Sequence, residues 1–519
     1  MSSTHVVAVA AAAGMATVAF LVRWLQVKPF IPSLKMAVHL HHVLFGVGDL
    51  LSSVEGLGRV TFDEADDDGM CQFWLMGLPC ISVLKAEHVR AVVVASNYRR
   101  RLWLLDDFVD AIVGTSGVDM ASLLTRRGVV KGKKSLVQVM GHEWKVHRKL
   151  ISKAFGWQNL ANMAPVIGTV ASEFAAVLLS KHGANNVDVF PLLKLATLDV
   201  IGATAFGASF GAIHNATSDV VDAFTFLLND MNRRSMDEPL HPASSLYWLP
   251  TSANRDFHAH KRTLRRTIDA LVAARLARGA HGDVHHDLLQ YMIDAAHDDD
   301  SGVTRQSFAD NLLTFLFAGY DTTSIALAYT LHLIAAHPEA QAKAVAEIDQ
   351  VVGPDALPTY DMVHRLTYCA AVVMEALRLF PPVLFTMRTL EADVDIGGHL
   401  VPKDTNVILP IYWIHRYEAN WGPDATAFRP DRHLTDDRVE MTAKDKAFRM
   451  MAFSGGPRNC VGMRFAMMEA VVLVAVLLRQ CAFSVPSDAP PVQAVVAGLV
   501  QNPQHGVWLD ITPRKAPTA

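Results

Sequence analysis

One stretch near the carboxyl end, FSGGPRNCVG at residues 453–462, constrains the fold of this 519-residue chain more than any other. It holds a single cysteine, Cys460, in a glycine-rich loop. A largely apolar run without Pro or Gly follows, which predicts a helix that begins just after the cysteine. Because the helix dipole favours a thiolate at a helix N-terminus, we expect a lowered pKa for this thiol. The stretch therefore predicts a loop that presents a sulfur ligand.

The residues around Cys460 suit a flat and bulky partner. Gly455, Gly456 and Gly462 let the backbone approach such a partner closely, and Arg458 offers a planar donor for a carboxylate. A sulfur for the iron, room for the ring and an arginine for a propionate are the requirements of a haem. The alternative is a structural cysteine in a turn before a helix, since free cysteine is usually a core residue.

This loop resembles the haem-binding loop of the cytochromes P-450, whose pattern is F-x-x-G-x-R-x-C-x-G. Phe453, Gly456, Arg458, Cys460 and Gly462 match every fixed position. The resemblance implies a haem whose iron is axially ligated by Cys460, with the ring of Phe453 shielding the thiolate. It also implies a mainly α fold, the cytochrome P-450 fold, in which a helical haem domain carries small β-sheets.

A long, largely apolar segment without proline, residues 307–336, predicts a helix of more than average length. A second membrane span is the alternative, but Asp310, Asp321 and a threonine pair inside the segment argue against it. A threonine in mid-helix tends to bond to a carbonyl three or four residues earlier and can bend the helix. Since Gly319 leaves space beside the backbone, we expect a groove edged by an acid and a hydroxyl.

The sequence AGYDTT within this segment resembles the oxygen-activation motif of the same family. The resemblance implies that Asp321 and Thr322 are catalytic and relay protons through water, with Ala318 beside the haem. Some fatty-acid ω-hydroxylases of the family carry Glu at the position of Ala318, and that carboxylate esterifies a haem methyl. Because Ala318 has no oxygen for such a bond, we expect a haem held by Cys460, propionate contacts and packing.

Two further features resemble the propionate contacts of the family. Trp144 and Arg148 lie four residues apart and therefore share a helix face, as in the W-x-x-x-R helix that reaches the haem propionates. Arg388, in FTMRTL, resembles the arginine that meets a propionate from a β-strand.

Glu375 and Arg378, three residues apart on one helix face, together with Arg432 resemble the Glu-Arg-Arg network of the family. An exposed salt bridge would contribute little stability, whereas a buried triad specifies how the chain folds. We therefore expect a structural role for these three residues.

Short β-structure is expected near both ends of the chain. Residues 70–83 predict a hairpin with Gly77 and Pro79 at its turn, and residues 496–513, with Gly498 and Gly506, predict a closing hairpin.

Composition sets broader limits. A hydrophobic content of 51% is ample for a large core, and a net charge of −4 gives no case for nucleic-acid binding. The 5 cysteines include no C-x-x-C pair, which indicates neither a disulfide framework nor a zinc site and suits a reducing compartment. The stretch at residues 281–300 is rich in His and Asp, but it has no fixed metal-ligand spacing and reads as a solvated loop.

The amino end predicts a membrane anchor. Residues 6–22 carry no charge and are followed by Arg23, Lys28 and Lys35, which places the rest of the chain in the cytosol. We expect a signal anchor and hinge at residues 1–27 and a haem domain at residues 28–519, at the endoplasmic reticulum membrane. A cleaved or merely interfacial segment is the alternative, although a cleaved signal would want a basic start.

The implied reaction is insertion of one oxygen atom from O2 into a lipophilic substrate such as a fatty acid or a sterol. Because the chain contains no G-x-G-x-x-G, electrons are expected from a flavoprotein NADPH reductase. Basic residues could dock that reductase, or they could form a merely solvated basic face. They are Arg126, Arg127, Lys131, Lys133, Lys134 and Lys149.

Alternatives to this reaction stay open at this point. A thiolate-haem isomerase or dehydratase acting on peroxides is one, and a haem sensor or electron carrier is another. Apolar residues flanking the motifs are expected to form a substrate pocket, although core packing explains them equally well. They are Phe315, Phe317, Pro382, Val383, Leu384 and Phe385.

Overall fold

The computed structural model describes most of the chain after residue 64. The described residues are 31, 33, 58, 62–63, 65–75, 78–95, 135–181, 185–215, 218–232, 251–279, 287–297, 305–354, 356–435, 439, 441–497 and 500–514. The predicted anchor, most of the predicted docking residues and much of the His- and Asp-rich stretch lie outside these ranges.

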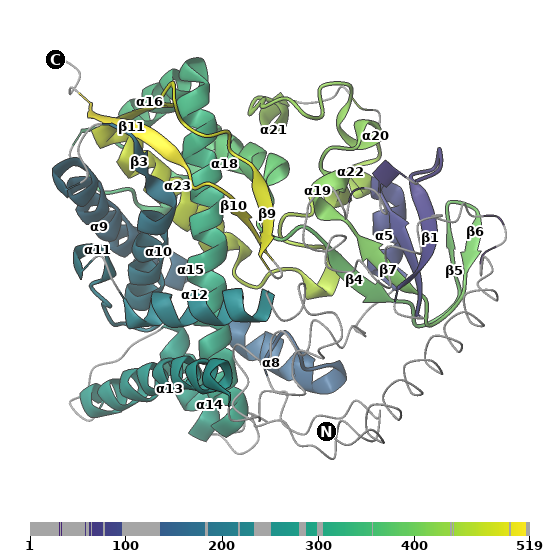
Figure 1. The fold of residues 1–519 in the computed structure, drawn as a ribbon, viewed down its shortest axis with the longest axis horizontal. Helices are drawn as coiled ribbons and strands as arrows, with labels where there is room; N and C mark the ends of the chain where they lie inside the picture. The colour runs from purple at the N-terminus through teal and green to yellow at the C-terminus, as the bar shows by residue number, and fades with distance from the viewer. Residues whose placement is uncertain are drawn as a thin grey trace, which may run out of the picture.

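The chain folds mainly into helices, as the sequence predicts, around one long central helix (Figure 1). The helices are α5 (Ala86–Ala95), α8 (Gly141–Ala154), α9 (Trp157–Lys181), α10 (Val189–Ala205), α11 (Ala212–Asn215), α12 (Asp219–Asn232), α13 (Ser252–Gly279), α14 (Leu288–His297), α15 (Arg305–Ala336), α16 (Pro338–Val351), α17 (Tyr360–Arg365), α18 (Thr367–Leu379), α19 (Ile411–Ile414), α20 (Glu418–Trp421), α21 (Arg432–Thr435), α22 (Ala443–Arg449) and α23 (Met463–Gln480).

The strands are short and belong to four small sheets. They are β1 (Met70–Leu75), β2 (Leu78–Val83), β3 (Val187–Asp188), β4 (Thr386–Thr389), β5 (Val394–Ile396), β6 (His399–Val401), β7 (Asn406–Leu409), β8 (Cys481–Ser484), β9 (Ala494–Ala497), β10 (Val500–Pro503) and β11 (Trp508–Pro513).

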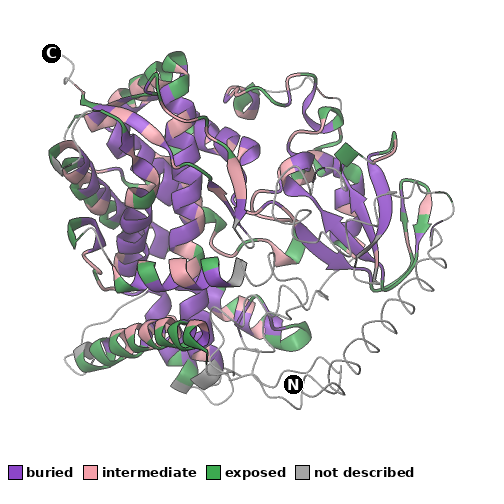
Figure 2. Cartoon of the chain, viewed as in Figure 1, coloured by how far each residue is buried: buried purple, intermediate pink, exposed green. Residues whose placement is uncertain are grey.

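Helix α15 confirms the long helix predicted from the sequence, and it forms the spine of the helical region. It packs against α10, α18 and α23, and most of its side chains are buried (Figure 2). Helix α23 is likewise a core helix, in which every residue from Met468 to Leu478 is buried and all except Glu469 are apolar. Helix α15 therefore packs as a core helix of the domain.

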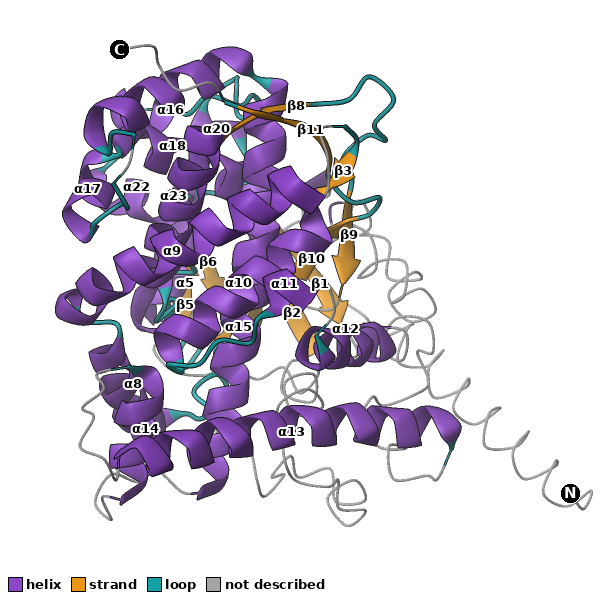
Figure 3. Ribbon diagram, turned by 90° about the vertical axis from the view of Figure 1, so that its left-hand side faces the viewer, coloured by secondary structure: helices purple, strands orange, loops and turns teal. Residues whose placement is uncertain are grey.

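One described helix, residues 157–180 of α9, is long and apolar enough to cross a membrane. Helix α9 packs against α23 and α10, and its buried face belongs to the main hydrophobic core. Its contacts are therefore those of a core helix of a globular domain (Figure 3).

A smaller β-rich region lies beside the helical one. Its sheet has the strand order β1-β2-β7-β4, and α5 and α19 share its hydrophobic core. The predicted hairpin at residues 70–83 is confirmed as the antiparallel pair β1 and β2. Pro79 was expected in the turn but lies inside β2, where it pairs with Trp74.

The predicted closing hairpin at residues 496–513 is wrong in its pairing. Strands β9 and β10 pair with each other, while β11 pairs with β3 and β8 in another sheet. Asp188 at the end of β3 explains the separation, because its carboxylate accepts the backbone N–H of Val507 at 2.9 Å. Gly506 has φ +77° and passes so close to that carboxylate that a Cβ would overlap it. The chain therefore turns toward β3 before β11 begins.

Candidate active site

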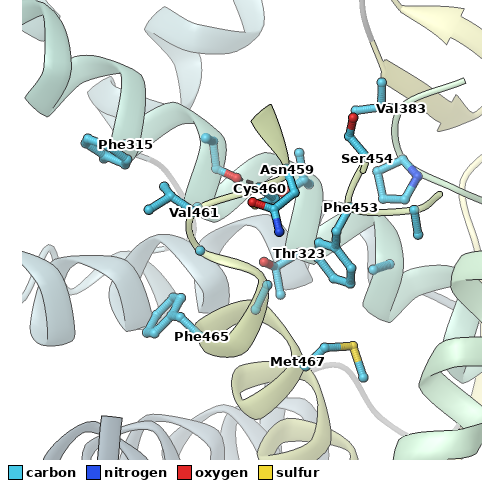
Figure 4. Close-up of a pocket in the computed structure, with 18 of the residues that line it drawn as sticks. Phe315, Thr323, Val383, Phe453, Ser454, Asn459, Cys460, Val461, Phe465 and Met467 are labelled. Atoms are coloured by element: carbon cyan, nitrogen blue, oxygen red, sulfur yellow. Dashed lines mark hydrogen bonds between the residues drawn. The ribbon is translucent and has the colours of Figure 1, made fainter. Parts of the chain in front are cut away.

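A cavity of about 360 Å³ lies between α15, α8 and the loop that precedes α23 (Figure 4). The Cys460 side chain opens into it. Most of its wall is apolar, and the apolar lining includes Phe155, Ile201, Phe315, Val383, Ile411 and Phe465.

The structure gathers most of the predicted site residues around this one cavity. Those that line the cavity are Trp144, Arg148, Ala318, Thr322, Phe453, Arg458, Cys460 and Gly462. Asp321 and Arg388 do not line it. Of the predicted apolar pocket, Phe315, Pro382 and Val383 lie on the wall, whereas Phe317, Leu384 and Phe385 do not.

Backbone hydrogen bonds fold the loop around Cys460 back on itself. The N–H of Cys460 donates to the carbonyl of Phe453 at 2.8 Å, and the N–H of Asn459 donates to Gly456 at 3.1 Å. Gly456 has φ +67°, and a Cβ there would lie 2.5 Å from Cγ1 of Val93 on α5. Glycine is therefore needed at this position for both the turn and the close packing of the loop on α5.

The helix predicted after Cys460 is confirmed, with Gly462 as its N-cap and Met463 as its first residue. The predicted lowering of the thiol pKa is wrong for the protein alone. Burial raises the pKa of Cys460, and this effect exceeds the opposing effects of the Gly462 N–H and the Arg148 charge. A bound haem iron would reverse this balance, since a thiol that coordinates a metal ion loses its proton.

Three arginines lie at this loop, two of them from other elements and Arg458 from the loop itself. Arg148 on α8 donates two hydrogen bonds of 2.6 Å to Asn459, one to the carbonyl and one to the side-chain Oδ1. Arg388 on β4 donates to Oγ of Ser454 at 3.0 Å. The guanidinium of Arg458 lies over the Trp144 ring, 4.3 Å from its centroid.

These features fit a haem. A thiol faces a mainly apolar cavity, and planar guanidinium donors, which match carboxylates in geometry, stand around the same loop. Arg148 is half-buried, and burial lowers its pKa, so a carboxylate partner beside it would compensate a charge that water solvates poorly. In the described part of the chain no group of three His, Cys, Asp or Glu side chains forms an alternative metal site.

The opposite wall of the cavity is α15. The hydroxyl of Thr322 donates to the carbonyl of Ala318 at 2.7 Å, which is the back-bond expected for a mid-helix threonine. Gly319 is required here because α10 crosses closely, and a Cβ would lie 2.8 Å from the Ile201 side chain. The Thr322 side chain lines the cavity.

Asp321 turns away from the cavity. Its carboxylate is fully buried and pairs with Nζ of Lys194 on α10, at 3.0 Å. The Lys194 side chain is 11% exposed, so the pair connects a fully buried acid with a slightly accessible amine. The sequence expectation placed Asp321 and Thr322 at one edge of a groove, but the structure puts them on different faces of α15.

The Glu375, Arg378 and Arg432 network is confirmed as a buried structural cluster. Oε1 of Glu375 lies 2.7 Å from Arg378 Nη2 and 2.9 Å from Arg432 Nε, and none of the three side chains is accessible. His433 is a fourth member, with its Nε2 2.9 Å from Oε2 of Glu375. Burial alone would raise the pKa of Glu375, but its bonds to Arg378 and His433 and the two arginine charges lower it to about 2.

The sequence analysis missed His415, which joins this network to the cysteine loop. Its ring is buried and lies between the carbonyl of Arg378, 3.1 Å from Nδ1, and the N–H of Met451, which donates to Nε2 at 2.7 Å. Burial lowers the pKa of His415 to about 3, so the ring is neutral and Nδ1 is the donor. No sequence spacing identifies His415, because its two partners lie far from it along the chain. Asn459 and Lys194 were missed for the same reason.

Comparison with known proteins identifies the class. The sequence profile described as Cytochrome P450 matches residues 107–509. The chain therefore belongs to the cytochrome P450 family, whose members bind haem through a cysteine thiolate. It is an oxidoreductase of the monooxygenase type.

Curated relatives come from both plants and animals. The chain is similar to 11-oxo-beta-amyrin 30-oxidase of Glycyrrhiza uralensis, with 32% identity over 72% of this chain and 71% of that protein. It is 27% identical to cytochrome P450 4V2 of Mus musculus, over 85% of this chain and 82% of that one. Cytokinin hydroxylase of Arabidopsis thaliana is 28% identical over 75% of this chain and 76% of its own length.

Proposed function

We propose that this protein inserts one oxygen atom from O2 into a lipophilic substrate, such as a fatty acid or a sterol, with Cys460 as the axial ligand of the haem. The observation that carries the proposal is one mainly apolar cavity whose lining includes both Cys460 and Thr322. A ligand, a hydroxyl and an apolar enclosure in one chamber are what oxidation of an apolar molecule requires.

When bound, the haem supplies oxygen activation, which its thiolate ligand promotes by donating electron density. The propionates would be held by Trp144, Arg148 and Arg458, which line the cavity. Arg388 would be a further propionate contact, since it bonds to Ser454 in the same loop. Phe453 lines the same wall as Cys460 and would shield the sulfur from water, with Gly462 and Ala318 leaving room for the ring.

Thr322 would hold a proton at the cavity wall through its hydroxyl. The Asp321 and Lys194 pair would resupply that proton through water, because Asp321 adjoins Thr322 in the chain and Lys194 is the member closer to solvent. In this proposal Asp321 supplies the proton, and Thr322 is the residue that contacts the cavity.

Electrons would come from a flavoprotein NADPH reductase, at the endoplasmic reticulum membrane, with residues 1–27 as the anchor and residues 28–519 as the cytosolic domain. Of the predicted docking residues, Lys149 is described, and it is exposed on α8. The same helix presents Trp144 and Arg148 to the cavity, so a reductase bound there would stand one helix away from the site. Removal of residues 1–27 should weaken membrane association without loss of haem.

The test reconstitutes the full chain with an NADPH reductase and follows NADPH, O2 and product together. We expect substrate-dependent O2 consumption and one labelled oxygen atom in the product when ¹⁸O2 is supplied. Candidate fatty acids, sterols and triterpenoids are first screened by the change of haem spin state on binding. Turnover of a peroxide without O2 or NADPH would instead support the isomerase, and haem binding without any turnover would support a sensor.

A further inference from the structure

Helix α10 packs along the part of α15 that carries the AGYDTT sequence (Figure 1). Lys194, Thr197 and Ile201 on α10 follow one another at intervals of three and four residues, so their side chains share one face of that helix. The Lys194 amine pairs with Asp321, and Ile201 packs against Gly319. Thr197 is the member of this face to which the proposed reaction assigns no role.

The Thr197 hydroxyl joins the two helices. It donates to the carbonyl oxygen of Tyr320 on α15 at 2.8 Å. The carbonyls of its own helix are further from it, at 3.0 Å for Leu193 and 3.3 Å for Lys194. A hydroxyl has a single proton to donate, and the shortest of the three contacts is the one between the helices. Because Thr197 is completely buried, water cannot replace this bond.

Thr204, on the same helix, shows that a buried threonine does not need such a partner. Its hydroxyl donates to the carbonyl of Val200, four residues earlier, at 2.7 Å. Thr204 is also buried, so the bond within its own helix satisfies its hydroxyl there. The bond from Thr197 to α15 is therefore more than a way to satisfy a hydroxyl.

The acceptor carbonyl belongs to the residue directly before Asp321 and two before Thr322. A carbonyl oxygen has two lone pairs, so the carbonyl of Tyr320 can accept from Thr197 as well as from its own helix. A side chain that bonds into the carbonyl ladder of a helix sets the local course of that helix. Lys194 thus holds a side chain of this turn, and Thr197 holds its backbone.

We propose that Thr197 is a positioning residue that fixes the backbone of α15 at Tyr320, and thereby keeps Thr322 at the cavity and Asp321 on Lys194. Thr197 is not part of the cavity lining, so it acts through α15. Its effect on catalysis rests on the proposed monooxygenase function, whereas the hydrogen bond to Tyr320 does not.

The first test needs no turnover. Tyrosine labelled with ¹³C at the carbonyl shifts the infrared amide bands of the 9 tyrosines, and Tyr320→Phe identifies the band of Tyr320 because that variant lacks it. Thr197→Val removes the hydroxyl at nearly constant volume and should move this band to higher frequency, because the carbonyl loses a hydrogen bond. The control Thr204→Val should leave the band in place. A band that Thr197→Val does not move overturns the proposal.

The second test measures product formed per NADPH consumed. Thr197→Val should lower this ratio several-fold and leave substrate affinity, followed by the haem spin state, unchanged. Thr197→Ser keeps the hydroxyl and should restore most of the ratio, while Thr204→Val should match the wild type. If valine is not tolerated at residue 197, Thr197→Ala makes the same comparison, since it removes the hydroxyl and adds no atom. A ratio in Thr197→Val equal to that of Thr204→Val overturns the positioning role.

A double variant shows whether Thr197 acts through the α15 wall. Thr197→Val combined with Thr322→Ala should form as much product per NADPH as Thr322→Ala alone, because both changes disable the same hydroxyl. A further several-fold drop in the double variant would contradict this route. Failure of the proposed function would instead appear as a wild-type protein that forms no product, with the infrared result unaffected.

Discussion

The two walls of the cavity are built in different ways. On the wall that carries Cys460, partners from distant parts of the chain fix the loop: Arg148 binds Asn459, Arg388 binds Ser454 and His415 binds Met451. On the α15 wall, the Thr322 hydroxyl is satisfied by its own helix. The one acid beside it, Asp321, faces α10 and not the cavity.

The difference suggests that the cysteine wall serves to bind the haem, whereas the α15 wall serves the reaction. A metal ligand must keep one position, and the cysteine wall achieves this with many long-range bonds whose loss would be felt throughout the fold. The α15 wall needs a groove and an available proton, which one helix and a neighbouring helix can supply. Changes to the first wall should therefore affect haem binding and stability, while changes to the second should affect the use of electrons.

The largest effect is expected at the ligand itself. Cys460→Ser should abolish the thiolate-type carbon monoxide spectrum of the reduced protein, because none of the other cysteines lines the cavity. Spectra of the reduced protein with carbon monoxide check this. An unchanged red-shifted band in the variant would mean that a different residue ligates the iron.

The next effect should come from the network behind the cysteine wall. Glu375→Gln should destabilise the protein by about 3–5 kcal/mol, because it leaves two buried arginines without their carboxylate. Denaturant unfolding of the haem-loaded protein measures this cost. The control Glu339→Gln, an exposed change in the first turn of α16, should cost at most about 1 kcal/mol. Equal costs in the two variants would contradict a structural role for the network.

The same carboxyl predicts a pH dependence. The pKa of Glu375 falls from 4.5 to about 2 on folding, so its contribution is present above pH 4.5 and is lost as the pH falls toward 2. This lowering corresponds to about 3 kcal/mol of stability. Unfolding curves of the wild-type protein and Glu375→Gln should therefore converge in acid, and parallel curves would argue against the assigned pKa.

A change in the α15 wall should leave the haem in place. Thr322→Ala should retain haem and substrate binding but lower product per NADPH several-fold, with hydrogen peroxide released, because in the proposed mechanism the hydroxyl serves only proton delivery. The control Thr330→Ala removes the same type of back-bond away from the cavity and should retain the ratio. A wild-type ratio in Thr322→Ala would refute its proton-relay role.

The smallest effect is expected at Ala318, which lines the cavity from α15. Because alanine cannot form an ester, acidified organic solvent should extract the haem completely and leave the peptide spanning residues 307–336 unmodified. Mass spectrometry of the protein checks this. Haem retained on that peptide would show that a second residue attaches the cofactor. The absence of the ester also leaves in-chain hydroxylation of a fatty acid open.

Elements that depend on residues close together in the sequence could be predicted from the sequence. The loop around Cys460, the helix after it and the long helix at residues 307–336 depend on glycines, apolar runs and the absence of proline, which act within a few residues. The Glu375 and Arg378 pair is also local, and the structure confirms it as buried. The pairing of β11 with β3 could not be predicted in this way, because it depends on Asp188, far away in the chain.

The sequence by itself determined the family, the ligand-bearing loop and the residues that surround it, because these follow from short patterns of residue types. Only the tertiary structure decided where side chains of one helix point. It turned Asp321 toward Lys194 and left Thr322 at the cavity. Consecutive helical residues point about 100° apart, so neighbours in the sequence face different elements. Which elements those are depends on how α10, α15 and α23 pack, and long-range burial decides that packing.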